Sequence, residues 1–580
     1  MLTRARPVLC ARAVIGATSL AAIIAACSPS PFAPHESDYA RRVANERLRQ
    51  VPTAPLDSYR KPAPPEGTPP TQPAAVAKAR FEGLERADLT LEACRASALE
   101  HNLSLRVAVI DPSIAAQRVS EEDARFESAF TLRSGISRTD SPTSSQLNSA
   151  QNENQFIVPG VRIPTRTGGT VTVTLPVSKN ENNNSFSTLN PAYASDVEFS
   201  ISHPLLRGAG RRANTAQLRV AGYDQQASES RTKLEVIRQL AAVDRSYWRL
   251  FQARRELEVR QQQHDLAAEQ LARAERRQRA GAVAEIEVVR AQAGAADRLE
   301  AIILAQNAVL LQQRELKRLI NQPGLALESR TLITPTTPPD PVEYAFDPAA
   351  LLAAAIDNRM EMLELELQLA ADAVRLESAR NAALPLLTLD YTYRVNGLGA
   401  SMQDTFHTLQ RNNFADWELG LSAEIPFGNE AAKSRIRQAI LARLARLATR
   451  AAREQAIRQE VLNAVDSLDA GWQRILAARQ SVILNTRALQ GEQRQFEVGA
   501  ATSTDVLDAA ARLADAQSAE VRALTDYQIA QVDLAFATGT LLGAAKVEWE
   551  PAPMPGVSRW GQDDHAAVDA PTPAHDVPQP

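Results

Sequence analysis

The chain has 580 residues, a formal net charge of −4, and 44 % hydrophobic but only 5 % aromatic residues. This balance, with no basic cluster interleaved with aromatics and no Gly-rich phosphate loop, excludes a nucleic-acid-binding protein. The seven histidines are scattered without HExxH-like spacing, so we expect no enzymatic activity, no metal site and no cofactor. A middle rich in Ala, Leu, Gln, Arg and Glu is instead typical of long helices that need partners.

The first 26 residues have the features of an export signal. Three arginines precede an apolar stretch over residues 13–26, which is too short to span a bilayer as a helix. The stretch ends IIAAC, and its small residues directly before Cys27 resemble a bacterial lipoprotein cleavage site. We predict a signal peptide over 1–26 and lipidation of Cys27, the alternative being an ordinary signal peptide with a stray cysteine.

Two further segments are predicted to lie outside the fold. Residues 27–87 combine the lipidated N-terminus with a Pro-rich linker that lacks apolar periodicity. Residues 546–580 are interpreted as a disordered, solvated acidic tail. Once Cys10 is removed and Cys27 is acylated, Cys94 has no partner, so no disulfide is expected.

Between linker and tail the sequence repeats itself. LTLEACRASALEHNLSL (89–105) is answered by DPAALLAAAIDNRMEM (347–362), and each segment begins a helix of about 35 residues. We predict a first repeat over 88–325, a linker over 326–346 and a second repeat over 347–545.

Each repeat is predicted to hold a strand pair, a very long helix and a return helix of half that length. The strands are expected at about 126–137, 196–203, 386–394 and 416–425. The long helices are expected at about 213–280 and 430–498, and the return helices at about 285–321 and 503–538. The half-length indicates that leading and return helices stack end to end, which gives four helical columns per chain.

Apolar and polar residues alternate along the strands. Leu389 and Leu421 belong to the apolar sets of their strands, and Thr388 and Ser422 to the polar sets. This pattern is what a transmembrane barrel needs, and although a soluble sheet gives the same alternation, no candidate core is left to cover it. Four strands cannot close a pore, so several chains would have to contribute to one barrel. The Asn-rich connection over 138–195 contains a further strand-like run and either extends the hairpin or forms a lid.

A small joint ends each long helix: AGAVAEIEVVRA at 280–291 and VGAATSTDVLDAA at 498–510. In the second joint, Thr502 and Asp505 have the spacing of a capping box. Asp505 and Asp508 lie three residues apart on one helix face. We predict that these two aspartates form an acidic pore constriction, with helix capping alone as the alternative.

The order of these elements, the LTLEACRASALEHN opening and FEVGAATSTDVLDAAARLADAQ resemble the outer-membrane efflux protein family, the TolC-like channels, over about 88–545. The resemblance implies an α+β membrane protein with an internal repeat, which assembles as a homotrimer. Twelve strands, four from each chain, would form one outer-membrane β-barrel, continued across the periplasm by a long α-helical barrel. A lipid-anchored N-terminus is common in one branch of the family.

The resemblance further implies a passive exit duct of a tripartite efflux or secretion system, which docks a periplasmic adaptor protein and an inner-membrane transporter. The residues expected at the adaptor-docking tips are Gly281, Ala282, Glu287, Gly499, Ala500 and Thr502. Phe496 and Ala501 stand where some members have a Tyr and an Arg that lock the tip. The alternative function is a periplasmic coiled-coil scaffold or adaptor, which the helices suit equally but the strands do not.

Overall fold

The computed structural model describes residues 59–60, 80–144, 148–281, 284–498 and 500–550. The chain divides into a unit over 1–71, of which only Tyr59 and Arg60 are described, and a unit over 72–580 that holds every element below. The predicted signal peptide, Cys27, most of the predicted linker and the tail from residue 551 lie outside the described residues.

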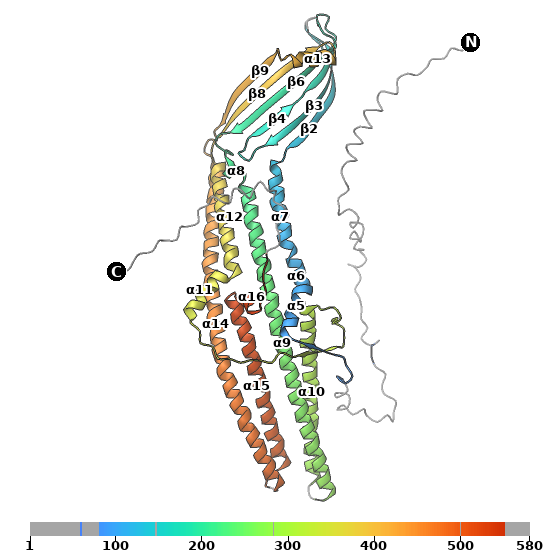
Figure 1. Cartoon of the computed structure of the whole chain (residues 1–580), viewed down its shortest axis with the longest axis vertical. Helices are drawn as coiled ribbons and strands as arrows, with labels where there is room; N and C mark the ends of the chain where they lie inside the picture. The colour runs from blue at the N-terminus through green and yellow to red at the C-terminus, as the bar shows by residue number, and fades with distance from the viewer. Residues whose placement is uncertain (1–58, 61–79, 145–147, 282–283, 499, 551–580) are drawn as a thin grey trace, which may run out of the picture. The chain divides into compact units, whose positions relative to one another are not determined.

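The second unit consists of long helices and one large sheet (Figure 1). The leading helices are α5 (Leu91–His101), α6 (Leu103–Ala108) and α7 (Ile110–Asp123), then α11 (Pro348–Asn358) and α12 (Met360–Ala382). The long helices are α9 (Ala216–Arg279) and α14 (Glu430–Glu497), and the return helices are α10 (Glu285–Ile320) and α15 (Ser503–Ala537). The long and return helices agree closely with the predicted ranges. None of the described helices has an apolar stretch long enough to cross a bilayer.

The leading helices are not continuous as predicted, because Asn102 and Arg359 break them. The Asn102 side chain accepts hydrogen bonds from the amides of Ser104 and Leu105, at 2.8 and 3.2 Å, and so caps α6. Its amide group donates to the Leu319 carbonyl at 2.8 Å, near the end of return helix α10. Arg359 similarly donates to the Ala537 carbonyl at 3.3 Å, at the end of α15. Each break therefore lies where a return helix ends.

Several short elements lie outside the predicted set. β1 (Arg86–Leu89) and β7 (Leu332–Pro335) form a parallel two-stranded sheet, so part of the predicted inter-repeat linker is a strand. The other short elements are η2 (Ala124–Phe126), α8 (Arg211–Asn214), α13 (Met402–Gln410) and α16 (Leu541–Ala544).

The large sheet contains seven strands in six columns. They are β2 (Ala129–Asp140), β3 (Gln151–Pro164), β4 (Thr170–Thr174), β5 (Val177–Asn182), β6 (Ala192–Pro204), β8 (Leu386–Gly399) and β9 (Ala415–Glu424). The order is β2-β3-β4-β6-β8-β9, all antiparallel, and β5 shares the column of β4 because it also pairs with β3 and β6.

The prediction of four strands per chain was therefore wrong, and the twelve-stranded barrel that the resemblance implies does not follow from this sheet. The predicted first hairpin partners, β2 and β6, do not touch, because the connection over 138–195 folds into β3, β4 and β5 between them. The segment QNENQFIVPG reads as a loop from its Asn, Gln and Pro content, yet it pairs along its whole length with β2.

The two faces of the sheet differ in polarity in the rows that run through β4, whereas the rows through β5 place Gln155 and Lys179 on the otherwise apolar side. One row across all six columns contains Phe130, Val161, Val173, Phe199, Tyr393 and Trp417. The next row, on the opposite face, contains Thr131, Gly160, Thr174, Glu198, Arg394 and Asp416. The apolar face is uncovered, since Phe130 is 70 % and Trp417 71 % exposed.

The hydrophobic core lies between the helices instead. One cluster, around Tyr247 and Leu316, joins α9 to α5 and α10. A second cluster, around Ile475 and Tyr527, joins α14 to α11 and α15. The helices thus have internal packing partners, whereas the sheet presents its apolar side chains outward.

Candidate functional site

The first joint connects α9 to α10 at the ends of the helices farthest from the large sheet (Figure 1). Gly281 has a φ of 70°, a left-handed conformation, and its amide donates to the Gln278 carbonyl at 2.8 Å. A glycine at this position ends a helix without side-chain strain. Glu287 forms an ion pair with Arg290 at 2.9 Å in the first turn of α10. Ala282 lies outside the described residues.

The second joint connects α14 to α15 and contains a complete capping box. The Asp505 carboxylate accepts hydrogen bonds from the amide and the hydroxyl of Thr502, at 2.8 and 2.7 Å. The Thr502 hydroxyl oxygen accepts from the Asp505 amide at 3.3 Å. The hydrogen bonds from the Thr502 backbone and side chain lower the pKa of Asp505, so its carboxylate is charged at neutral pH. Ala500 donates to Gln495 at 2.8 Å, and Gly499 lies outside the described residues.

Asp505 and Asp508 differ in the hydrogen bonds that their carboxylates make. Both side chains are exposed, and their spacing places them on one side of α15. The carboxylate of Asp505 is engaged by the cap. Asp508 makes no hydrogen bond or ion pair with any residue that the structure describes. Helix capping therefore accounts for Asp505 and leaves Asp508 without a structural role in the joint.

An unpredicted contact links the two long helices near their joints. The guanidinium carbon of Arg277, in the last turn of α9, lies 4.5 Å from the ring centroid of Phe496 in α14. This is within the range of a cation–π interaction. From the sequence, Phe496 was noted only because it lacks the hydroxyl of the tyrosine that some family members have there. In the structure its ring instead contacts the guanidinium group of Arg277, which lies beside the other joint. The sole sequence signal for Arg277 was the cluster of basic residues that ends α9.

Replacing Phe496 with leucine is expected to loosen this contact, because the aliphatic side chain keeps the bulk but lacks the electron-rich ring face. The cost is about 0.5–1 kcal/mol at an exposed site, so amides in the last turn of α9 should exchange their hydrogens about two- to fivefold faster. Phe496→Tyr is the matched control, since it retains the ring and should exchange like the parent. Equal exchange in all three proteins would show that the ring does not hold Arg277.

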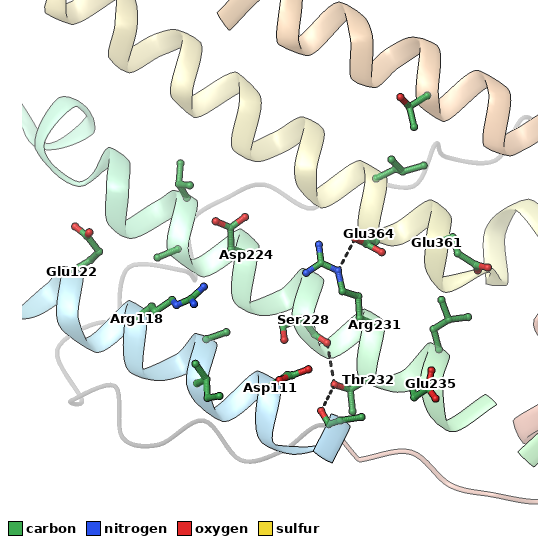
Figure 2. Close-up of a pocket in the computed structure, with 18 of the residues that line it drawn as sticks. Asp111, Arg118, Glu122, Asp224, Ser228, Arg231, Thr232, Glu235, Glu361 and Glu364 are labelled. Atoms are coloured by element: carbon green, nitrogen blue, oxygen red, sulfur yellow. Dashed lines mark hydrogen bonds and ion pairs between the residues drawn. The ribbon is translucent and has the colours of Figure 1, made fainter. Parts of the chain in front are cut away.

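A cavity of about 1030 Å³ lies between α7, α9 and α12. Figure 2 shows Arg231 of α9 directed at Glu364 of α12, to which its Nε donates at 2.7 Å. The lining contains seven acidic and four arginine side chains and no histidine or cysteine. A lining of this kind holds water and counterions and offers no nucleophile–base pair. We therefore do not interpret the cavity as an active site.

Comparison with known proteins identifies the family. The model of the family described as outer membrane efflux protein matches residues 95–322 and 351–540. The outer membrane protein TolC of Vibrio cholerae serotype O1 is 25 % identical over 302 residues, which cover 52 % of this chain and 67 % of the relative.

Solved structures share the fold at lower identity. A membrane protein from Pseudomonas aeruginosa superposes with a TM-score of 0.59 at 19 % identity, covering 77 % of this chain and 93 % of that one. The CmeC outer membrane channel of Campylobacter jejuni superposes with a TM-score of 0.58 at 16 % identity, covering 78 % and 86 %. Because the family model matches both helical halves, and with them most of the sequence, the chain belongs to the outer membrane efflux protein family.

Proposed function

We propose that this chain is the outer-membrane exit duct of a tripartite efflux or secretion system, a passive channel and not an enzyme. The observation that carries the proposal is the large sheet, whose uncovered apolar face continues through all six columns. Leaving such a face in water costs about 25 cal/mol for each Å² of apolar surface, whereas lipid solvates it. The polar face then lines a water-filled lumen.

In this proposal the chain acts as a homotrimer, because one sheet alone has two free edges. The edge strands β2 and β9 run antiparallel to each other, since they are the first and last of six antiparallel columns. The β9 edge of one copy can therefore pair with the β2 edge of the next until the ring closes, which removes both edges. The similar element order of the two halves supports an internal repeat over 88–325 and 347–545. Each repeat contributes two helical columns to a periplasmic α-barrel.

The two joints are the proposed docking site for a periplasmic adaptor, which couples the duct to an inner-membrane transporter. They are the exposed ends of helix pairs at the opposite end from the membrane sheet (Figure 1). Gly281, Ala282 and Glu287 belong to one joint, and Gly499, Ala500 and Thr502 to the other. Because the two joints differ in sequence, a trimer presents six tips that alternate around the ring.

Removing the charge of Asp508 tests the proposed acidic constriction without disturbing the cap. In a trimer, Asp505 and Asp508 supply six carboxylates at the tip, and such rings favour cations. Asp508→Asn is expected to lower the cation selectivity of channels in planar bilayers and to weaken their block by multivalent cations. Folding should be unaffected, since the side chain has no partner among the described residues.

Asp505→Asn is the companion variant, because it removes a charge and weakens the capping box together. It should lower selectivity and also destabilise the start of α15 by about 0.3–1 kcal/mol, because a negative charge in the first turn of the helix is lost. If Asp508→Asn leaves selectivity and block at parental values, the aspartates form no constriction and the cap is the whole explanation.

A lipid anchor on Cys27 is the second feature proposed for the membrane end. Mass spectrometry of the mature protein should find an N-terminal peptide that begins at an acylated Cys27. Cys27→Ser should lose this modification and still yield trimers, because the barrel supplies the larger apolar surface in the bilayer. An unmodified mature N-terminus at another residue would refute the anchor and leave the barrel untouched.

A periplasmic scaffold or adaptor made of coiled coils is the rival function. The helices of a scaffold would pack as they do here. A scaffold in the periplasm would, however, expose the apolar face of the sheet to water. Carbonate extraction of bacterial membranes separates the two functions. The exit duct should stay in the outer-membrane pellet until detergent is added, whereas a scaffold should be released by carbonate.

A further inference from the structure

β4 and the part of β3 that pairs with it carry the same two-faced pattern as the rest of the sheet, whereas the β5 part places Gln155 and Lys179 on the apolar side. Val161 and Val173 lie in the apolar row between Phe130 and Phe199. Both valines are 39 % exposed. The insertion therefore continues the lipid-facing surface of the proposed duct without a polar interruption in this row.

The pairing of the insertion is that of a wall and not of a lid. β3 pairs with β2 over twelve consecutive residue pairs, from Ala129–Arg162 to Asp140–Gln151. The column of β4 and β5 pairs with β6 on its other side, and the carbonyl of Pro176 bridges the break between the two strands by accepting from the Asp196 amide at 2.9 Å. A lid would cross the open end of the strands, whereas these columns run alongside them.

The girth of the helical part fits a wider sheet. Twelve helical columns at about 9–10 Å spacing give a circumference of about 110–120 Å. Twelve strands spaced about 4.8 Å apart and tilted by about 40° give only about 75 Å, whereas eighteen give about 113 Å. At an ordinary strand tilt, six columns per chain match the helices beneath them.

We propose that β3 and the β4–β5 column are two additional wall columns in each chain, so that three copies of the six-column sheet close an eighteen-column barrel. This inference rests on the proposed function. At equal tilt the barrel is about 1.5 times as wide as one of twelve columns. Gly160, Arg162, Thr172 and Thr174 lie on the lumen face of the added wall. The outer-membrane section is therefore not the narrow part of the duct, and the joints alone limit the size of the exported solute.

Neighbouring cysteines on opposite faces test the placement. Thr174→Cys should react with a water-soluble maleimide in intact outer membranes. Val173→Cys should react at least about tenfold more slowly, because the reactive thiolate is disfavoured without water. Fluorophores on Val173→Cys should be quenched by a nitroxide-bearing lipid. Cys94 adds no background, because it is 1 % exposed and burial raises its pKa to about 12, and Cys27→Ser serves as the parent.

The pair Phe199→Cys and Ser200→Cys, on β6, is the control that separates the two ways of failing. If the β6 pair shows the contrast and the β4 pair reacts equally fast, the insertion is not wall and the inference is overturned while the channel survives. If neither pair shows contrast or quenching, the membrane barrel itself is wrong. As an independent test, electron cryomicroscopy of the trimer in lipid nanodiscs should show eighteen strand columns. A count of twelve would overturn the inference.

Discussion

Replacing Arg359 with methionine is expected to lower the free energy of unfolding by about 3–5 kcal/mol, because it leaves a buried carboxylate without its partner. The Arg359 side chain is 4 % exposed and the Glu361 side chain is 8 % exposed. Two guanidinium nitrogens of Arg359 donate to the Glu361 carboxylate at 2.7 and 3.0 Å. A third donates to Glu460 of α14 at 2.8 Å and to the end of α15. This one side chain therefore joins α12, α14 and α15 where the leading helix breaks.

The pH dependence of this loss identifies its cause. Burial alone would raise the pKa of Glu361, but the hydrogen bonds and charge of Arg359 outweigh it and hold the pKa below its usual value. In the parent, the pair's contribution is present above the unfolded pKa of about 4.3 and is lost as the pH falls through the lower folded value. In Arg359→Met burial is opposed only by the backbone hydrogen bond of Glu361 and the charge of Arg238, which are weaker influences, so Glu361 binds a proton more readily when folded. The deficit of the variant should shrink as the pH is lowered from 7 to 5.

Chemical unfolding of the purified protein, followed by helical circular dichroism, measures both effects. Adding Glu361→Gln to Arg359→Met should recover part of the loss. Arg458→Met is the control, since it breaks an exposed pair with Glu454 worth only about 0.3–0.5 kcal/mol. If the free energy of unfolding of Arg359→Met is only slightly below that of the parent, or if the difference does not change with pH, then Glu361 is not left buried and without a partner in the variant.

The second large effect is expected from Leu421→Arg, which should abolish trimer assembly in the membrane. Leu421 is 65 % exposed on the apolar face and lies opposite Leu389 in β8. An arginine there faces lipid, where each charge costs up to about 2–4 kcal/mol depending on its depth, and a trimer contains three. Leu389→Arg should behave alike.

Ser422→Arg and Thr388→Arg are the matched controls, because these two residues pair with each other on the polar face. Their arginines remain in the aqueous lumen and should be tolerated. The readout is heat-modifiable trimer in the outer-membrane fraction on gels. Equal assembly of Leu421→Arg and Ser422→Arg would show that the two faces meet the same solvent.

Local sequence signals predicted the structure where the causes are local. Three-to-four spacing gave the long and return helices closely, and the alternation in β8 and β9 placed Leu389 and Leu421 on one face. The capping box follows from Thr502 and Asp505 three residues apart, so it was predicted as well. Each of these features depends on residues within one or two turns of chain.

Features fixed by distant partners were missed. Helical periodicity continues through Arg359, so the sequence alone does not show a break there. The break is explained by Glu460 of α14, which follows strands β8 and β9 in the sequence and accepts a hydrogen bond from Arg359. The strand β3 was missed because its Asn and Gln content suits a loop, and its pairing with β2 and β5 overrides that preference. Arg277 and Phe496 come from different halves of the chain, so no local pattern pairs them.

The central claim, that copies of this chain enclose a membrane-spanning water channel, is tested most directly by recording currents from the purified protein in planar lipid bilayers. The polar lumen face predicts discrete, ohmic conductance steps that require the assembled protein and disappear with Leu421→Arg but not with Ser422→Arg. Bilayers that stay electrically silent with folded, detergent-stable trimer, or steps that persist unchanged in Leu421→Arg, would contradict the account.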